Sequence, residues 1–441
     1  MNQKEYDKPI SLWSASSALP QFESLKTDIK TDVLIIGGGI TGILCAYLLK
    51  QAGVNYVLAE ANTICSGVTK NTTAKITSQH GLVFHKLIKR FGIEKTGLYL
   101  KANQEALEKY TRLCAGIDCD FEIKDAFVYS RDNLQKITDE TDALQSLHFP
   151  AEFVQRLPLP FSVAGAVKFP GQAQFHPLKF IAAIAKDLNI YEHTMVRELT
   201  ERGARTAWGS IQADRIIVAT HFPFLNKHGS YFLKMFQQRS YVIALEHASN
   251  LDGMYRDEAS NGMSFRSCRG LLLLGGGGHR TGKEGGGWEE LTQFAALHYP
   301  DAKEQFRWAA QDCMTLDNLP YIGNYSKNTP NFYTATGFSK WGMTSAMVSA
   351  MLLTDLITGK ENPYAGVFSP SRSILRPQLA LNALESAKNL LTISTPRCPH
   401  LGCALKWNKA EHSWDCPCHG SRFDEEGHLI DNPATGNLKK G

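Results

Sequence analysis

The sequence predicts an α/β chain that begins with a Rossmann-like nucleotide-binding domain and ends with a small metal-binding domain. Two clusters of residues lead to this prediction. A glycine-rich turn separates a strand pattern from a helical pattern within residues 31–61. Far along the chain, four cysteines and three histidines gather within residues 398–423. At 441 residues, the chain is long enough for two or three domains with separate cores.

The composition excludes several other classes of protein. The chain is 43% hydrophobic and 20% charged, with a formal net charge of +4 and no basic stripe interleaved with aromatic residues. We therefore expect no nucleic-acid partner. Residues 1–30 carry charges throughout and lack the apolar core of a secretory signal. Since no run of about 18 uninterrupted apolar residues follows, we expect no membrane span and a cytoplasmic protein. A homo-oligomer is compatible with all of these features.

The N-terminal turn carries a dinucleotide-binding fingerprint. Gly37, Gly39 and Gly42 fit G-x-G-x-x-G, and Glu60 closes the second predicted strand. The first glycine permits the turn, the second lets a pyrophosphate approach the backbone, and the third lets the helix pack closely on the sheet. Glu60 is placed to accept hydrogen bonds from a ribose, while the amides at the start of the helix favour phosphate. A dinucleotide site is therefore predicted.

Three later stretches favour FAD over NAD, a choice that the fingerprint leaves open. Residues 66–77 form a hydroxyl-rich loop, including Thr69, that suits the ribityl chain and pyrophosphate of a flavin. Residues 213–226 form another buried strand that ends in small residues. Residues 331–359 have the pattern of a strand, a glycine turn and a long helix whose N-terminus is aimed at a cofactor. The residues of this turn that we expect to contact the flavin are Gly337, Lys340, Trp341, Gly342, Met343 and Thr344.

Together these stretches resemble the D-amino-acid-oxidase-like family of FAD oxidoreductases, which includes the glycine and sarcosine oxidases. The resemblance covers roughly residues 31–360. It implies a discontinuous FAD-binding domain interleaved with a mixed-sheet substrate domain, and it places Val196 where the family contacts adenine through the backbone. Residues 317–323 are similar to the family's D-G-x-P-x-I-G turn beside the flavin, although Asn318 replaces the glycine.

The C-terminal cluster contains two loops that each supply one thiolate and one imidazole. Cys398 and His400 are spaced C-x-H, and Cys416 and His419 are spaced C-x-x-H. Such a set suits a [2Fe–2S] cluster in which two histidines replace two cysteines on one iron, and the neutral imidazoles raise its potential. Both half-motifs match the Rieske signature. This resemblance implies a small all-β Rieske domain with these four residues as ligands.

Zinc is the alternative metal, since four cysteine and histidine ligands can hold a tetrahedral ion. Zinc sites, however, use C-x2–4-C pairs. Here the four ligands come from C-x-H and C-x-x-H, and Cys403 and Cys418 remain as two extra cysteines at equivalent places in the two loops. In the high-potential Rieske proteins that the loops resemble, cysteines at these places form a disulfide. Few residues precede the first loop, so either the base of the domain is abbreviated or the flavoprotein body replaces it as a packing surface.

These features divide the chain into four segments. We expect an N-terminal extension (1–30), the FAD-dependent oxidoreductase (31–370), a linker (371–390) and an abbreviated Rieske domain (391–441). A flavin takes up two electrons with a hydride, whereas a [2Fe–2S] cluster carries one electron at a time. We therefore expect a dehydrogenase that oxidises an amine or amino acid and passes electrons singly through the cluster to an external one-electron acceptor.

Three other functions are weighed against this one. Reversed electron flow and a non-enzymatic electron carrier both use the same two cofactors. A Rieske oxygenase would also need a mononuclear iron held by two histidines and a carboxylate. His80 and His85 have H-x4-H spacing, but no acidic residue precedes them at a suitable step.

The candidate catalytic residues are His176, Arg239 and Tyr241. His176 precedes a helix opened by Pro177, while Arg239 and Tyr241 lie on a strand similar to the family strand that runs over the flavin. Arg239 could clamp a substrate carboxylate through two hydrogen bonds. A surface ion pair is the alternative for this arginine.

Overall fold

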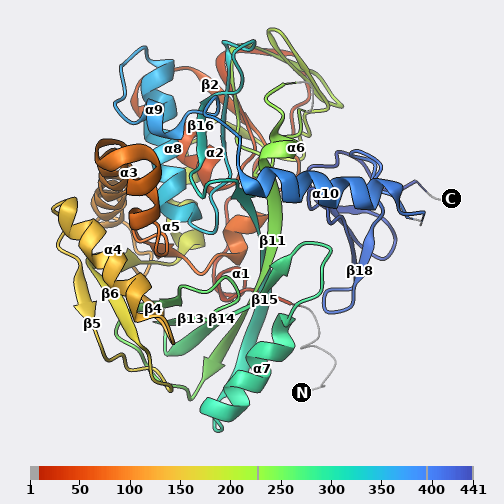
Figure 1. The fold of residues 1–441 in the computed structure, drawn as a ribbon. Helices are drawn as coiled ribbons and strands as arrows, with labels where there is room; N and C mark the ends of the chain where they lie inside the picture. The colour runs from red at the N-terminus through yellow and green to blue at the C-terminus, as the bar shows by residue number, and fades with distance from the viewer. Residues whose placement is uncertain (1–8, 226–227, 394–395, 440–441) are drawn as a thin grey trace.

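The computed structural model describes residues 9–225, 228–393 and 396–439. The described chain contains two large β-sheets, one small sheet near the C-terminus, and helices packed around them (Figure 1). The first sheet lies in the upper half of this view and the second in the lower half, and the small sheet stands to the right.

The first sheet is the predicted Rossmann-like core. Its strand order is β16-β17-β10-β1-β2-β7, with the hairpin β8–β9 beside β10. All pairs along this order are parallel except β16 with β17. The strands are near-continuous apolar runs because both faces of the sheet are buried, and α2 packs against α8. The elements are β1 (Ile29–Ile36), α2 (Ile40–Gln51), β2 (Tyr56–Ala59), β7 (Ile190–Tyr191), β8 (Glu198–Thr200), β9 (Gly203–Arg205), β10 (Ser210–Val218), β16 (Tyr321–Asn324), β17 (Phe332–Thr336) and α8 (Gly342–Ile357).

The second sheet is mixed, as the resemblance implied. Its order is β15-β11-β14-β13-β12-β4-β6-β3, with β5 beside β6. Strands β4 and β12 are parallel and the other pairs are antiparallel. The chain enters this sheet twice, after β2 and after β10, so the two domains are interleaved. The strands are β3 (Lys75–Ile76), β4 (Glu122–Ser130), β5 (Glu152–Val154), β6 (Gly165–Gln174), β11 (Met235–Glu246), β12 (Met254–Asp257), β13 (Ser264–Cys268), β14 (Leu271–Arg280) and β15 (Lys303–Thr315).

Helices cover the outer surfaces of this body. The long helix α3 packs against α4 and α8, and α7 packs against β11 and β14. The remaining elements of the body are η2 (Val68–Asn71), α3 (Phe84–Cys114), α4 (Leu134–Ser146), α5 (Pro177–Ala185), α6 (Tyr231–Lys234), α7 (Gly287–His298) and α9 (Ala365–Phe368).

Residues 9–30 pack on the body. Helix α1 (Leu12–Ser16) buries Trp13 completely, and its indole Nε1 donates to the carbonyl oxygen of Thr72 at 2.7 Å. The first eight residues of the expected extension lie outside the described residues. Among the helices that the structure describes, none has the length and apolar character needed to cross a membrane.

The C-terminal sheet confirms a small all-β domain. Its four antiparallel strands follow the order β18-β19-β20-β21, and they are β18 (Lys406–Asn408), β19 (Ser413–Asp415), β20 (Arg422–Phe423) and β21 (Leu429–Asp431). The segment expected to be a linker, residues 371–390, is largely helical. It forms most of α10 (Pro377–Leu391), which runs along the outside of the molecule above the small sheet (Figure 1).

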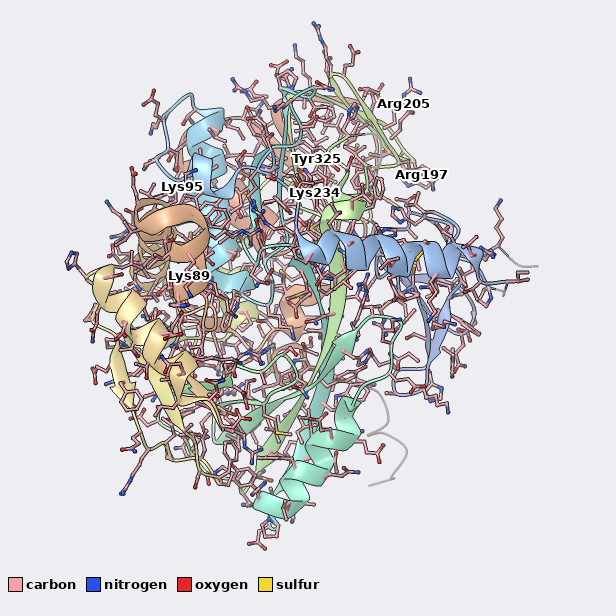
Figure 2. The ribbon with its side chains drawn as sticks, in the orientation of Figure 1. Lys89, Lys95, Arg197, Arg205, Lys234 and Tyr325 are labelled. Carbon is pink, nitrogen blue, oxygen red and sulfur yellow. A yellow bond between two sulfur atoms is a disulfide. The ribbon has the colours of Figure 1, made fainter. Side chains whose placement is uncertain are left out.

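The chain is fixed to the body just before α10. Lys234 and Tyr325 lie together near α6 (Figure 2), and Lys234 Nζ donates to the carbonyl oxygen of Pro370 at 2.9 Å. Burial lowers the pKa of Lys234 to about 8. Helix α6 also packs directly against α10.

Candidate functional site

A cavity of about 570 Å³ lies between the two large sheets and the C-terminal domain. This volume is within the range of small-molecule and cofactor sites. One part of the wall comes from the glycine turn and the ends of β2 and β10, and another from β11, β12 and β14. Residues of the segment 429–437, which belongs to the C-terminal domain, line the cavity as well.

The glycine turn joins β1 to α2 as the fingerprint predicts. Gly37 has φ +107°, and a Cβ there would lie 2.6 Å from the carbonyl oxygen of Ala219. A Cβ on Gly42 would run into the Gly37 carbonyl, so Gly42 permits helix packing and does not line the cavity. At Gly39 a Cβ would meet only Thr69 Oγ1, at 3.5 Å. The turn is therefore open on its cavity side, where a pyrophosphate can approach the backbone.

Glu60, Thr69 and Val196 all line the cavity. The Glu60 carboxylate accepts from the backbone N–H groups of Gly38, at 2.6 Å, and Asn62, at 2.8 Å. Burial raises the pKa of Glu60, and these two donors partly offset that effect. Thr69 Oγ1 accepts from the N–H of Ile40 at 3.0 Å and so caps the first turn of α2.

The second glycine turn, between β17 and α8, also reaches the cavity. Five of its six predicted contact residues line the wall, and Thr344 lies behind it. Thr344 Oγ1 donates to the carbonyl oxygen of Thr77 at 3.0 Å and lies 2.9 Å from Nε2 of His80. The His80 ring stacks on Trp341 with centroids 5.1 Å apart. The five lining residues are Gly337, Lys340, Trp341, Gly342 and Met343.

The two histidines spaced H-x4-H have separate structural roles. Burial lowers the pKa of His80 to about 3, so the ring is neutral within its hydrogen bonds. The ring of His85 instead faces Asp139, with 3.7 Å between nitrogen and oxygen. Among the described residues, neither histidine belongs to a group of side chains that could hold a metal ion.

Of the three candidate catalytic residues, only Tyr241 lines the cavity. Its hydroxyl lies 3.0 Å from His279 Nε2 and donates to Glu411 at 3.0 Å. The Arg239 guanidinium is 3% exposed and binds the Glu411 carboxylate through two hydrogen bonds. Burial raises the pKa of Glu411, but Arg239 and Arg422 outweigh burial and bring that pKa down to about 2. Arg239 therefore forms a buried ion pair with the C-terminal domain.

His176 has a structural role outside the cavity wall. Its Nδ1 accepts from the backbone N–H of Lys179 at 3.2 Å, which caps the N-terminus of α5. Its Nε2 lies 3.0 Å from Ser16 Oγ, and its ring contacts Trp13 edge-on. Burial lowers the pKa of His176 to about 4. His176 is thus not among the residues that line the cavity, unlike Tyr241 and the two glycine turns.

Sequence reasoning missed several ionisable residues of the cavity wall. Lys75, His221, Arg256 and Asp312 all line it. Burial raises the pKa of Asp312, although the charges of Lys340, His221 and Arg256 act against this. Arg256 donates to the carbonyl oxygen of Gly262 at 3.5 Å and has no ion pair with a described carboxylate. No sequence signal singled out Arg256 or Asp312, because β12 and β15 carry other charged residues as well.

The two loops of the metal motif have the same backbone design. In each, the N–H of the first cysteine donates to the carbonyl five residues later, and the N–H of a glycine four residues on donates back to the cysteine carbonyl. All four bonds are 2.9 Å long, and both glycines have positive φ angles, of 79° and 88°. The bonded pairs are Cys398 with Cys403, Gly402 with Cys398, Cys416 with Ser421, and Gly420 with Cys416.

The donor set fits a Rieske cluster. The thiols of Cys398 and Cys416 are unbridged and buried, and a hydrogen bond with Cys416 lowers the pKa of Cys398 to about 7. The rings of His400 and His419 lie 5.0 Å apart. Within the described chain, the buried Nδ1 of His419 has no hydrogen-bond partner, so it is available as a ligand.

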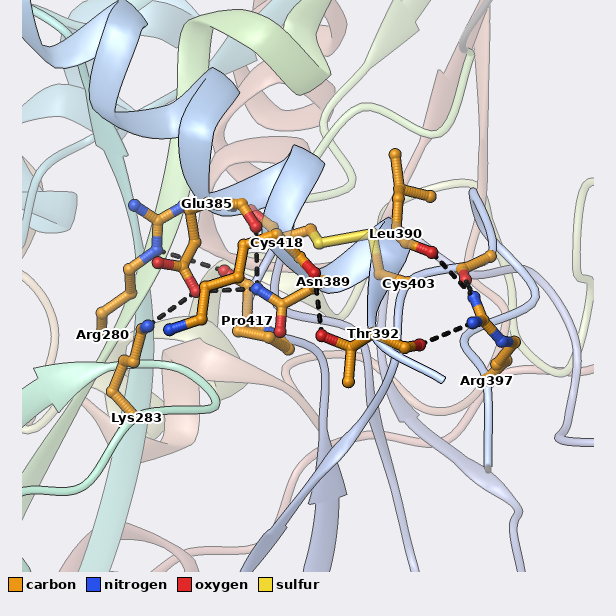
Figure 3. Close-up of a disulfide and its surroundings, with 12 residues drawn as sticks. Arg280, Lys283, Glu385, Asn389, Leu390, Thr392, Arg397, Cys403, Pro417 and Cys418 are labelled. Atoms are coloured by element: carbon orange, nitrogen blue, oxygen red, sulfur yellow. Dashed lines mark hydrogen bonds and ion pairs between the residues drawn. A yellow bond between two sulfur atoms is a disulfide. The ribbon is translucent and has the colours of Figure 1, made fainter. Parts of the chain in front are cut away.

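The disulfide between Cys403 and Cys418 is confirmed (Figure 3). It spans a sequence separation of 15 residues and ties the two loops together. The two cysteines are therefore unavailable to zinc, although Cys403, Cys416 and Cys418 lie within metal-binding distance of one another.

The flavoprotein body is the packing surface of the two cluster loops. Gln237 on β11 donates to the carbonyl oxygen of His419 at 2.8 Å, and Gln311 on β15 donates to that of Gly420 at 2.8 Å. Arg280 on β14 donates to the carbonyl oxygen of Pro417 at 3.1 Å (Figure 3). These three strands thus provide the packing surface that few residues before the first loop could supply.

The cluster loops and the cavity are neighbours. The His419 ring contacts the rings of Phe222 and Phe232, which belong to the body. Asn432, which lines the cavity, donates from its side chain to the carbonyl oxygens of Thr220, at 2.7 Å, and Phe222, at 2.8 Å. The site of the second cofactor is thus joined to the wall of the first through a few residues.

The interleaved Rossmann-like fold, the cavity and the two Cys/His loops define a flavin-dependent oxidoreductase joined to a Rieske iron–sulfur domain. Residues 32–356 match the family model of the FAD dependent oxidoreductases (DAO), and residues 372–440 match that of the Rieske [2Fe-2S] domain. The chain therefore belongs to the FAD dependent oxidoreductase family and ends in a Rieske domain. FAD and a [2Fe–2S] cluster are its cofactors. The exact boundaries of the four segments expected from the sequence (1–30, 31–370, 371–390 and 391–441) remain a prediction.

Three known proteins are similar to this chain. The iron–sulfur protein YhfW of Bacillus subtilis (strain 168), named as a Rieske 2Fe-2S protein, is 36% identical over an alignment of 499 positions that covers 98% of each chain. Gamma-glutamylputrescine oxidoreductase of Escherichia coli (strain K12) is 24% identical, over 78% of this chain and 88% of that protein. The crystal structure of glycine oxidase from Geobacillus kaustophilus has a TM-score of 0.65 at 20% identity, covering 78% of this chain and 99% of that one.

Proposed function

We propose that this protein is a dehydrogenase that oxidises an amine or amino acid and passes electrons singly, by way of its Rieske domain, to an external acceptor. The observation that carries the proposal is the position of the Rieske domain. Its segment 429–437 lines the flavin cavity, and its cluster loops pack on β11, β14 and β15. Electrons that leave the cavity toward this domain need cross only a few residues.

The substrate class is supported by the names of relatives. Gamma-glutamylputrescine oxidoreductase and glycine oxidase are both named for substrates that carry an amino group. When bound, FAD supplies a hydride acceptor for a C–H beside such a group, and a [2Fe–2S] cluster supplies single-electron transfer.

The protein's own residues would bind and orient the two partners of the reaction. The open side of Gly39 and the N-terminus of α2 would receive the pyrophosphate. Arg256 is the better candidate for an anionic group of the substrate, because Arg239 is already neutralised by Glu411. Tyr241 also lines the cavity, but its hydroxyl already donates to Glu411, so no substrate contact is assigned to it.

Anaerobic titration tests the proposed direction and substrate class. The purified protein is mixed with a panel of amino acids and amines while the flavin absorbance is followed, and a one-electron acceptor such as ferricyanide is then added. We expect at least one amine-bearing compound to bleach the flavin and to support reduction of the acceptor. Dithionite is the control for a reducible flavin. If dithionite bleaches the flavin and no compound of either class does so, the proposed function is wrong.

A further inference from the structure

Helix α10 is amphipathic, but its polar face is turned toward the body and its apolar face is turned outward. Its polar side chains face the body: Asn382 is 3% exposed and accepts from Arg280 at 3.0 Å. Glu385 forms an ion pair with Lys283 at 2.6 Å, and Asn389 is 2% exposed (Figure 3). A surface helix of a globular protein normally turns its apolar stripe toward the core.

The outer face of α10 is apolar. Of the helix residues that are exposed, Lys388 is the only one with a polar or charged side chain. Leu381, Leu384 and Leu391 are 56%, 68% and 81% exposed. The apolar residues of this outer face are Pro377, Ala380, Leu381, Ala383, Leu384, Ala387, Leu390 and Leu391. The chain adds further exposed side chains at both ends of the helix, Leu375 at 77% and Ile393 at 98%.

Such a face needs a permanent cover. Soluble monomers rarely expose contiguous apolar patches of this kind, and larger ones mark interaction sites. A transient redox partner would leave the face in water for most of the time. A constitutive occupant, present whenever the chain is folded, avoids this cost.

The shape of the outer face fits a second copy of itself. Leucines at positions 381, 384 and 391 form a row, and alanines at 380, 383 and 387 form the adjoining, lower row. In an antiparallel pair of helices, the leucine row of each can lie along the alanine row of the other. If the pair is centred on Leu384, Lys388 of each copy lies beside Ala380 of the other, so the two ammonium groups stay apart. Such a contact is self-complementary, as a two-fold dimer requires.

We infer that the protein is a homodimer whose interface is centred on an antiparallel pair of α10 helices. A stable interface buries roughly 800 Å² on each partner, so α10 forms the centre, and the surfaces around Leu375 and Ile393 extend it. Because α10 is bonded to the flavoprotein body through Asn382 and Glu385, dimerisation also fixes the segment that connects the two cofactor domains.

Light scattering coupled to size exclusion tests this inference on the full-length holoprotein. We expect the wild type to have about twice the chain mass of 48.9 kDa. The Leu384→Glu variant should run as a monomer with unchanged FAD and iron content, since the side chain is exposed and touches neither cofactor site. Leu297→Glu, on the exposed surface of α7, is the matched control because Leu297 is 75% exposed. It should remain dimeric.

A second variant reports the geometry directly. Leu384→Cys places a thiol at the predicted crossing point, and mild oxidation should give a cross-linked dimer on a non-reducing gel. The unbridged native cysteines of the described chain are buried, so the wild type should not cross-link. A monomeric wild type, or a dimer that Leu384→Glu leaves intact, would overturn the inference. Flotation of a monomer with vesicles of phosphatidylglycerol would assign the outer face to a lipid surface instead.

Discussion

Replacing Glu411 with glutamine should weaken the docking of the Rieske domain by a few kcal/mol. The carboxylate binds Arg239 of the substrate sheet and Arg422 of the Rieske domain, and both guanidinium groups are buried, at 3% and 6% side-chain exposure. Removing one partner of a buried ion pair leaves a charge without compensation and costs about 3–5 kcal/mol. The lowered pKa of Glu411, from 4.5 to about 2, corresponds independently to ~3 kcal/mol.

The same pKa fixes the pH dependence of this contribution. Because the pKa of Glu411 is lower in the folded than in the unfolded state, its stabilisation is fully present above pH 4.5 and is lost as the pH falls toward 2. Linkage predicts ~3 kcal/mol at pH 7 and about 2 kcal/mol at pH 3.5. The difference between the wild type and Glu411→Gln should therefore shrink with acid.

Urea unfolding, followed by visible circular dichroism of the cluster, measures this difference at several pH values. The matched control is Glu425→Gln in the same domain, because Glu425 and its partner His412 are 54% and 73% exposed. Exposed pairs contribute about 0–1 kcal/mol, so the control should change little. If Glu411→Gln is as stable as the control at pH 7, or if its deficit does not fall with acid, the ion pair does not hold the domain in place.

Three further outcomes are expected. The purified protein should contain FAD with about two irons and two labile sulfides per chain, whereas zinc without sulfide would contradict the cluster. Gly39→Val should abolish FAD binding and spare iron content, because only Thr69 Oγ1 lies near the new Cβ, at 3.5 Å; equal loss of both cofactors would indicate misfolding. Arg256→Gln should raise KM for a substrate with a carboxylate roughly 10- to 100-fold, because it removes a hydrogen bond to a charged group. An unchanged KM would exclude Arg256 as the residue that binds this carboxylate.

Local patterns were enough to predict the cofactor sites from the sequence. Gly37 is required by the positive φ of the turn, Gly39 leaves the cavity side open for a pyrophosphate, and Glu60 follows the second strand of the same short unit. The Rieske loops are equally local, because each is closed by backbone bonds within six residues. Both cofactors could therefore be predicted from the sequence, and the interleaved fold followed from the family resemblance.

The substrate side could not be predicted in the same way, since it depends on contacts between distant segments. Arg239 resembled a carboxylate clamp, but Glu411, 172 positions further along the chain, occupies its guanidinium. His176 preceded a helix, and the structure uses it as the cap of that helix. Arg256 and Asp312 belong to no motif, and only the folding of β12 and β15 into one wall brings them to the cavity.

The most direct test of the proposed electron path is stopped-flow spectroscopy of cluster variants. With a reducing substrate present, His419→Ala and Cys398→Ser should still show bleaching of the flavin at the parental rate, because the glycine turns and the substrate wall are untouched. Reduction of a one-electron acceptor should be lost in both. His412→Ala, at an exposed histidine outside the two loops, is the control and should behave as the parent. A cluster-free variant that reduces the acceptor at the parental rate would contradict the account, because electrons would then leave the flavin without the Rieske domain.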